Sequence, residues 1–235
     1  MARHSKRYLE AAKLVDKTQL YSLEEAVELV KKTSQVKFDP AVEVAIRLGV
    51  DPSKGEQTVR GSLTLPHGTG RTPRVVVFAK GEAAEAAEAA GADRAGGDDL
   101  IEAIDGGWSE FDVLVAHASI MREVGKLGKK LGPRMPNKKA GTIAATPEEL
   151  GSIVRELKSG RVEFKMDRGA VLHVSVGRAS FETSQLLENL DALIGAVVQA
   201  RPSAAKGRYL IGIAIASTMG PGVKIDVQDA LRRAA

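Results

Sequence analysis

The sequence contains no cysteine, few aromatic residues and only four scattered histidines. Without cysteine the chain forms no disulfide and has no thiolate nucleophile, and the histidines show no close metal-ligand spacing, so no metal site is predicted. No apolar run approaches the roughly 20 residues that span a bilayer, and no signal-peptide core follows the basic N-terminus. We therefore expect a cytoplasmic protein with no membrane partner.

Aromatic residues make up only 4% of the chain, which argues against a sheet that stacks many RNA bases on rings. The distribution of charge along the chain is more informative. Residues 67–159 hold 13 Lys and Arg against 14 Asp and Glu, so this middle segment carries no positive excess. The two outer pieces hold the remaining 21 of 34 basic and 16 of 30 acidic residues, so the whole positive excess of the chain, whose net charge is +4, lies in them. That excess is compatible with a nucleic-acid partner.

The glycine-rich segments do not fit a phosphate-binding loop. Gly128-Lys129-Lys130 lacks the hydroxyl that follows the lysine of a P-loop, and the Gly-Thr-Gly at 68–70 precedes its strand. His117 and Asp112 have no nucleophile or second carboxylate at a recognisable spacing, so neither a catalytic residue nor a cofactor is predicted. A nucleotide-dependent enzyme using the middle of the chain stays open as an alternative, as does a protein-interaction scaffold.

Both ends of the chain alternate apolar and polar residues, as half-buried strands do. Such strands are predicted at 41–50, 57–66, 161–166 and 170–181. We expect the first two to form an antiparallel pair across a turn-rich link, and the last two to form a hairpin across Asp167-Arg168-Gly169. Ser22 and Glu25 have capping-box spacing at the start of a helix, and a later helix is predicted to be capped by Thr183 or Ser184.

Residues 67–159 follow another pattern. Continuous apolar runs at 73–80 and 111–119 are interleaved with predicted helices, which is typical of a parallel sheet covered on both faces. The residues allow three consecutive small units or one α+β domain interrupted by a Rossmann-like insertion. The charge distribution and the change in strand pattern favour the insertion.

The motif Ser217-Thr218-Met219-Gly220-Pro221 follows an apolar strand. We expect Gly220 to adopt φ > 0 and Pro221 to fix φ at about −65°, giving a sharp, rigid turn. Amides left unpaired by the sheet would lie beside the hydroxyls of Ser217 and Thr218, as donors to phosphate or ribose, and Met219 would add an apolar contact. A hairpin connection with no ligand stays open for the motif alone.

A second basic candidate is residues 122–139, where glycine and proline interrupt regular helix. This segment would present cations to RNA or tRNA phosphates, and a solvated basic surface is an equal alternative. Its cations are Arg122, Lys126, Lys129, Lys130, Arg134, Lys138 and Lys139.

Nearly the whole chain resembles one family, the universal large-subunit ribosomal protein of the mobile side stalk at the tRNA exit site, in its bacterial type. The likeness rests on KFDPAVEVAIRLGVDPSKGEQTVRGSLTLPHGTG, GADRAGG, GRVEFKMDRGAVLHVSVGRASF and STMGP, in the family's order. It implies a non-enzymatic protein of mixed α/β and α+β class. Its expected domains are a discontinuous α+β split-βαβ domain at 1–66 and 160–235, which binds rRNA, and a Rossmann-like three-layer α/β insertion at 67–159.

The resemblance also implies partners: large-subunit rRNA, tRNA at the exit site, and the protein's own operon mRNA, which it would repress. Outside the ribosome it implies a monomer. The RNA-facing set implied by the likeness is Lys37, Phe38, Glu43, Lys165, Asp167, Arg168, His173, Ser217, Thr218, Met219, Gly220 and Pro221. In that set the cations would neutralise phosphates, while Glu43 and Asp167 would orient cations or accept from a 2′-OH.

Two departures from the family pattern stand out. This chain has Pro40 and Ala41 where the family usually shows a Glu and a Thr, so a hydroxyl contact is missing there. In the basic segment, LGPRMPNKKAG lacks a Gly-Leu pair and has Lys138 in place of a second proline.

Overall fold

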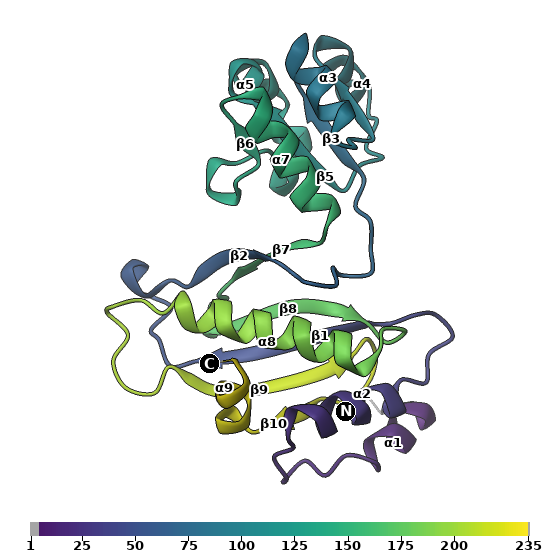
Figure 1. The fold of residues 1–235 in the computed structure, drawn as a ribbon, viewed down its shortest axis with the longest axis vertical. Coiled ribbons are helices and arrows are strands. Elements are labelled where there is room, and N and C mark those ends of the chain that lie inside the picture. The colour runs from purple at the N-terminus through teal and green to yellow at the C-terminus, as the bar shows by residue number, and fades with distance from the viewer. Residues whose placement is uncertain (1–4, 235) are drawn as a thin grey trace. The chain divides into compact units, whose positions relative to one another are not determined.

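The computed structural model describes residues 5–234, without the side chains of Lys139 and Ala234. The chain divides into two compact units (Figure 1). The outer unit comprises the described residues up to Gly70 and from Val162 onward, and the inserted unit comprises Arg71 to Arg161. The chain therefore leaves the outer unit once and returns to it once.

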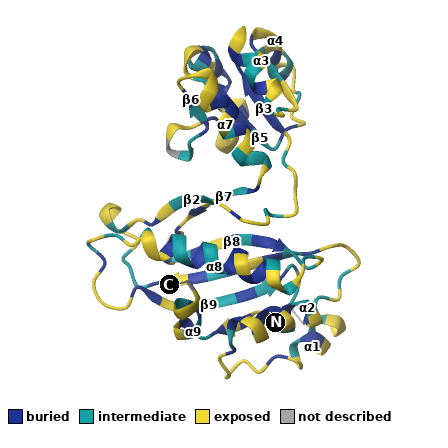
Figure 2. Ribbon diagram, viewed as in Figure 1, coloured by how far each residue is buried: buried dark blue, intermediate teal, exposed yellow. Residues whose placement is uncertain are grey.

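The outer unit is built on a four-stranded antiparallel sheet in the order β10-β9-β1-β8. Its strands are β1 (Ala41–Leu48), β8 (Val171–Arg178), β9 (Leu210–Ser217) and β10 (Val223–Ile225). In β1 every second residue is buried, as the alternating sequence predicts, because successive side chains point to opposite faces of a strand (Figure 2). The sheet therefore has one core face and one face toward solvent.

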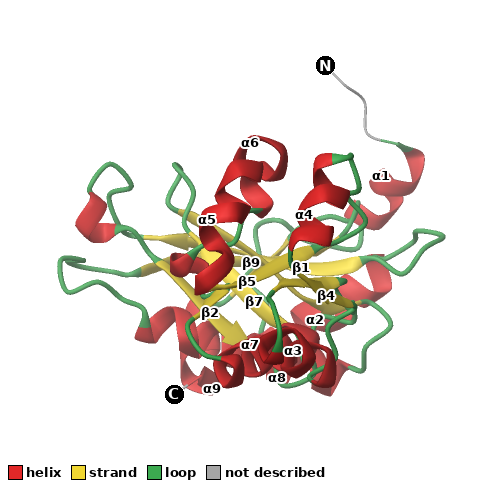
Figure 3. Ribbon diagram, turned by 90° about the horizontal axis from the view of Figure 1, so that it is seen from above, coloured by secondary structure: helices red, strands yellow, loops and turns green. Residues whose placement is uncertain are grey.

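Three helices cover the core face, as Figure 3 shows for the outer unit. They are α2 (Leu23–Thr33), α8 (Thr183–Gln199) and α9 (Val227–Ala234), and a short α1 (Lys6–Ala12) precedes them. The capping box of Ser22 and Glu25 is present at the start of α2. The predicted cap of α8 was wrong: Glu182 is the N-cap and shares its capping box with Gln185, one residue earlier than Thr183.

We call the solvent side of this sheet the open face. None of its residues is fully buried: Glu43, Ala45, Arg47, Val171, His173, Ser175, Gly212, Ala214, Ala216 and Lys224. Cross-strand pairing sets them in rows, with Ala45 between His173 and Ala214, and with Arg47 between Val171 and Gly212. The open face is thus a floor of small residues with a few charged side chains.

Two predicted strand pairs were wrong. β2 (Arg60–Thr64) pairs with β7 (Arg161–Lys165) in a separate two-stranded sheet, and β2 does not pair with β1. Both edges of β1 are already taken by β8 and β9, so no edge is free for β2. β7 and β8 form no hairpin because Ala170, with φ of 58°, turns the chain into the other sheet.

The inserted unit has a parallel sheet in the order β4-β3-β5-β6. Its strands are β3 (Val75–Phe78), β4 (Arg94–Gly96), β5 (Val113–His117) and β6 (Ile143–Ala144). Helices α4 (Asp98–Asp105), α5 (Met121–Val124) and α6 (Gly128–Leu131) pack on one face, and α3 (Glu82–Ala89) and α7 (Pro147–Lys158) on the other (Figure 3). This layering is what the continuous apolar runs predict.

Asp93 connects two elements of the inserted unit, because its Oδ2 accepts hydrogen bonds from the amide of Val75 (2.7 Å) and from Lys158 Nζ (2.6 Å). Burial acts to raise the pKa of Asp93, but these two hydrogen bonds outweigh it and lower the pKa. A lowered folded-state pKa adds stability above the unfolded value of about 3.9, and this stability is lost as pH falls through the folded value. Asp93→Asn should therefore destabilise the protein near neutral pH.

Urea unfolding of the wild type and of Asp93→Asn at about pH 7 and about pH 3 measures this effect. The difference in free energy of unfolding should shrink at the lower pH. Glu88→Gln, an exposed substitution on α3, is the matched control and should show no comparable pH dependence. A difference that stays constant between the two pH values would contradict the role of the Asp93 charge.

Candidate nucleic-acid interface

The segment Ser217–Pro221, which we call the corner, joins β9 to β10. The Thr218 amide donates to the carbonyl of Ala41 at 2.9 Å, and its hydroxyl lies 3.2 Å from the same oxygen. The Gly220 amide donates to the Ser217 carbonyl at 2.8 Å. Met219 is 68% exposed although its neighbours are tied down. The corner is therefore a fixed turn that presents one apolar side chain to solvent.

The backbone of the corner differs from the expectation in three respects. The left-handed residue is Met219, with φ of 67°, rather than Gly220. The amides of Thr218 and Gly220 are paired inside the protein, because Ala41 at the start of β1 accepts from the first and the Ser217 carbonyl accepts from the second. Ser217 is 3% exposed, so its hydroxyl is not presented to a ligand. A non-glycine residue at positive φ costs roughly 1–2 kcal/mol, and such strain is often found at functional sites.

Residues that the sequence analysis missed lie beside the corner. A small depression is lined by Arg7 and Tyr8 of α1, by Gln35, and by Thr218 and Met219. Arg7 is exposed and adds a cation to this end of the sheet. No motif marks Arg7, because the chain fold alone brings α1 to the corner.

Lys37, Phe38 and Glu43 belong to the same end of the outer sheet. The first two precede β1 directly, and the side chain of Phe38 is 56% exposed. Glu43 projects from the open face, where it pairs with Ala216 of β9. Together with the corner they form a surface of mixed charge with two exposed apolar side chains, which we call the corner surface.

The family's hydroxyl residue is replaced here by Ala41, and the structure shows what this position does through its backbone. Its carbonyl accepts both hydrogen bonds from Thr218. This contact needs no side chain, so the departure leaves the geometry of the corner intact. Pro40 is buried, and its carbonyl accepts from the amide of Ala179.

The remaining members of the predicted set lie toward the opposite end of the sheet. Lys165, Asp167 and Arg168 are exposed and precede β8, whose first residue, Val171, pairs with Arg47 far along β1 from the corner. His173 lies between the two groups on the open face. The structure therefore divides the predicted set into two groups near opposite ends of the four-stranded sheet, with Lys165 on β7 of the separate two-stranded sheet.

Asp167 has a structural task in its own turn. Its Oδ1 accepts hydrogen bonds from the amides of Val171 and Gly169, both at 2.8 Å. The bond from Val171 is the largest cause that lowers the pKa of Asp167, and that from Gly169 and the nearby His173 lower it further. The carboxylate therefore stays ionised and holds the turn that carries Arg168.

The basic segment of the inserted unit consists of short helical turns rather than an open loop. Lys130 binds the side chain and the carbonyl of Asp105, and Arg134 donates to the Phe111 carbonyl while lying 5.6 Å from its ring centroid. These two cations are engaged inside the unit. The other cations whose side chains are described, Arg122, Lys126, Lys129 and Lys138, are exposed too, and the side chain of Lys139 lies outside the described residues.

Among the described residues no three His, Asp or Glu side chains gather in a way that would hold a metal ion. Within the same residues, no helix combines the length and apolar character needed to cross a bilayer. What gathers on the outer unit is a set of exposed cations, a hydroxyl and apolar side chains. Such a mixture suits contact with the phosphates, riboses and bases of RNA.

The fold and this surface are those expected of an RNA-binding protein. Residues 30–221 match the Ribosomal protein L1p/L10e family, and the chain belongs to that family. It is 53% identical over 236 residues to the large ribosomal subunit protein uL1 of Thermomicrobium roseum, an alignment that covers 100% of this chain and 98% of that protein. These matches confirm the resemblance found in the sequence. Family membership places the protein in the cytoplasmic ribosome and excludes the alternative of a nucleotide-dependent enzyme.

Proposed function

We propose that the corner surface of the outer unit binds a folded element of large-subunit rRNA. The observation that carries this proposal is the conformation of the corner. Met219 is held in a strained left-handed conformation and is largely exposed, in a turn whose neighbouring amides are fixed. A protein gains nothing for its own stability from this arrangement, so a ligand that needs the side chain there explains it.

The surrounding charges support RNA as the ligand. Arg7 and Lys37 are exposed cations next to the corner and would neutralise phosphates. The exposed side chain of Phe38 offers a ring face for one unstacked base. Glu43 would accept a hydrogen bond from a ribose 2′-OH, a group that DNA lacks.

We further infer that the inserted unit contacts tRNA as it leaves the exit site. The support is a group of exposed cations in this segment, Arg122, Lys126, Lys129 and Lys138. Lys130, by contrast, forms an ion pair with Asp105. Tethered hydroxyl-radical probing of exit-site tRNA from this segment tests the contact.

We also propose that the protein represses its own operon mRNA. A surface that recognises the shape of a folded rRNA element binds any RNA with the same shape, so an mRNA copy would compete with the ribosome. A gel-shift competition between rRNA and the leader of the operon mRNA tests this: the two RNAs should displace each other.

Met219→Ala is expected to lower the affinity for purified large-subunit rRNA by about tenfold, the effect of losing roughly 1.4 kcal/mol of apolar contact. The melting temperature should change little, because the side chain is exposed and packs on little of the protein. Filter-binding titration measures the affinity. Val198→Ala, an exposed aliphatic position on α8, is the control and should leave binding unchanged. Equal affinities for the wild type and Met219→Ala would count against the corner surface.

A further inference from the structure

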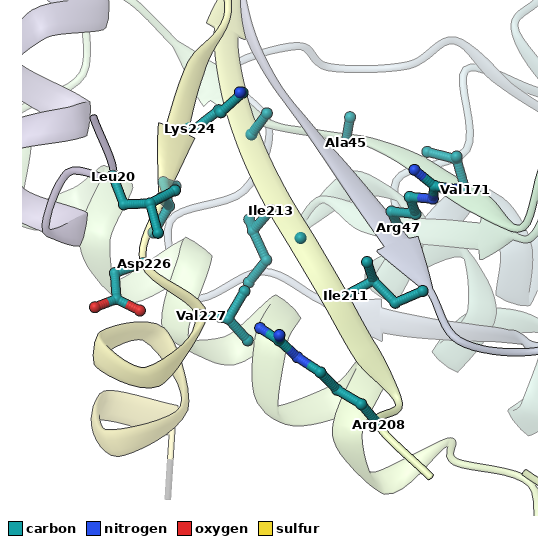
Figure 4. Close-up of a pocket in the computed structure, with 13 residues that line it drawn as sticks. Leu20, Ala45, Arg47, Val171, Arg208, Ile211, Ile213, Lys224, Asp226 and Val227 are labelled. Atoms are coloured by element: carbon teal, nitrogen blue, oxygen red, sulfur yellow. The ribbon is translucent and has the colours of Figure 1, made fainter. Parts of the chain in front are cut away.

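A groove lies at the end of the open face that is remote from the corner, around the first residues of β9 (Figure 4). Its volume is about 380 Å³, within the usual range of ligand sites. The floor is made of small residues of β1 and β9, Ala45, Gly212 and Ala214. None of the groove's residues belongs to the set that the family resemblance implies.

Three cations surround the groove, namely Arg47 on β1, Arg208 just before β9 and Lys224 on β10, as Figure 4 shows. Arg208 Nε donates to the Leu210 carbonyl at 3.0 Å, and Lys224 Nζ donates to the Lys17 carbonyl at 3.1 Å. These neutral acceptors orient the side chains and leave their charges uncompensated. Within residues 5–234 no salt bridge involves any of the three cations.

The groove also exposes apolar surface between its cations. Leu20 is 59% exposed and Ile211 is 42% exposed, and both line it. The one carboxylate among the described lining residues, Asp226, accepts a hydrogen bond from the amide of Gln228. A fitting ligand therefore has a flat apolar part and negative charge close together. An unpaired nucleotide has both, and guanidinium planes such as those of Arg47 and Arg208 stack on bases.

The groove is continuous with the proposed RNA surface. Arg47 lies on the same face of β1 as Glu43, four residues further along the strand and thus about 13 Å away. Val171, the β8 residue that pairs with Arg47, follows the turn that carries Arg168. One RNA strand crossing the open face from the corner to Arg168 would therefore pass the groove.

We propose that an unpaired nucleotide of the RNA that contacts the corner surface occupies this groove. Its base lies against Ile211 and the small-residue floor, and its flanking phosphates lie near Arg47, Arg208 and Lys224. This inference rests on the proposed function, because it extends the binding site along the same face of the sheet.

The absence of cysteine from the chain makes a direct test possible, since any introduced cysteine is the single thiol. Ile211→Cys, Met219→Cys and Lys32→Cys are each labelled with a short azidophenacyl photocrosslinker and bound to purified large-subunit rRNA. Lys32 lies on α2, which covers the core face, and serves as the control. Probes at 211 and 219 should crosslink to nearby nucleotides of one RNA region, and the control should give no crosslink.

A second measurement avoids any bulky probe in the groove. Arg47→Gln and Lys224→Gln should each reduce the slope of log affinity against log salt by about 0.7–0.9, the change expected for one lost phosphate contact. Lys32→Gln, which removes a cation paired with Glu28 on α2, should leave the slope unchanged.

The outcomes separate this inference from the proposed function. Crosslinks from position 219 alone, with unchanged slopes, overturn the groove site and leave the corner surface standing. Crosslinks from neither position overturn both. A probe at 211 that reacts only with a neighbouring protein in intact subunits, and not with purified rRNA, shows a protein occupant and also overturns the proposal.

Discussion

Gly220→Ala is expected to weaken rRNA binding by about fivefold or more while the outer unit stays folded. A Cβ atom at Gly220 would clash with Ser217 Oγ, at a separation that real Cβ atoms essentially never show. Ser217 is 3% exposed and has little space to move, so the corner must open to admit the methyl group. Overpacking of this kind costs about 1–3 kcal/mol, and every 1.4 kcal/mol of lost binding energy is about tenfold in affinity.

The second substitution of this pair removes the clash. In Ser217→Ala the hydroxyl oxygen is gone, and the nearest atom to the new Cβ is then the carbonyl oxygen of residue 217, at 3.2 Å. Ser217→Ala alone should be neutral or stabilising, because the buried hydroxyl has no hydrogen-bond partner among the described residues. The double variant should therefore recover most of the lost affinity.

Filter binding and urea unfolding of all four proteins complete this double-mutant cycle. Recovery in the double variant would show that the shape of the corner, rather than either side chain, is what the RNA reads. A double variant as weak as Gly220→Ala would mean that the contact with Ser217 is not the cause.

Asn189→Ala is expected to lower the free energy of unfolding of the outer unit by about 2–4 kcal/mol. Asn189 is a fully buried polar residue of α8. Its Nδ2 donates to the carbonyls of Val176 (2.8 Å) and Gly68 (3.0 Å), and its Oδ1 accepts from the amide of His67 (3.0 Å). Truncation leaves three backbone groups without this partner, and each buried unsatisfied group costs about 1–3 kcal/mol.

The neighbouring residue provides a matched control. Glu188 also binds His67, through a 2.6 Å contact with Nε2, but its side chain is 61% exposed. Glu188→Ala should therefore cost less than about 1 kcal/mol. Circular dichroism follows the whole protein, whereas fluorescence of the single tryptophan, Trp108, follows the inserted unit. The Asn189→Ala effect should appear in the first signal and leave the second nearly unmoved; similar losses in both variants would contradict the buried role.

The sequence predicted the faces of the strands better than their partners. Alternation in 41–48 shows which residues are buried, because it follows from the two-residue period of a strand. It carries no information about which strand lies alongside, so β2 was paired with β1 when its partner is β7. A short link between two strands predicts that they pair only when the first strand has a free edge. Both edges of β1 are paired, with β8 and β9.

A motif in the sequence predicts the corner as a candidate site, but no motif predicts the residues that tertiary contacts bring beside it. The motif STMGP predicted a turn at the corner. The left-handed residue is Met219 rather than the expected Gly220, because the contacts of Thr218 with Ala41 hold the turn in place. Arg7 and Arg208 carry no motif and reach their places through the fold. The sequence does indicate where Arg47 lies, because the alternation in β1 places it on the same polar face of the strand as Glu43.

The central place of β1 in its sheet has a consequence for the order of folding. Both neighbours of β1, β8 and β9, follow the inserted unit in the chain. During synthesis from the N-terminus, β1 must therefore wait with both edges unpaired until residues beyond 170 have been made. The inserted unit, whose strands and helices are contiguous in the chain, can fold in the meantime. In nascent chains of this protein the inserted unit can therefore fold before the outer unit, although the outer unit contains the N-terminal residues.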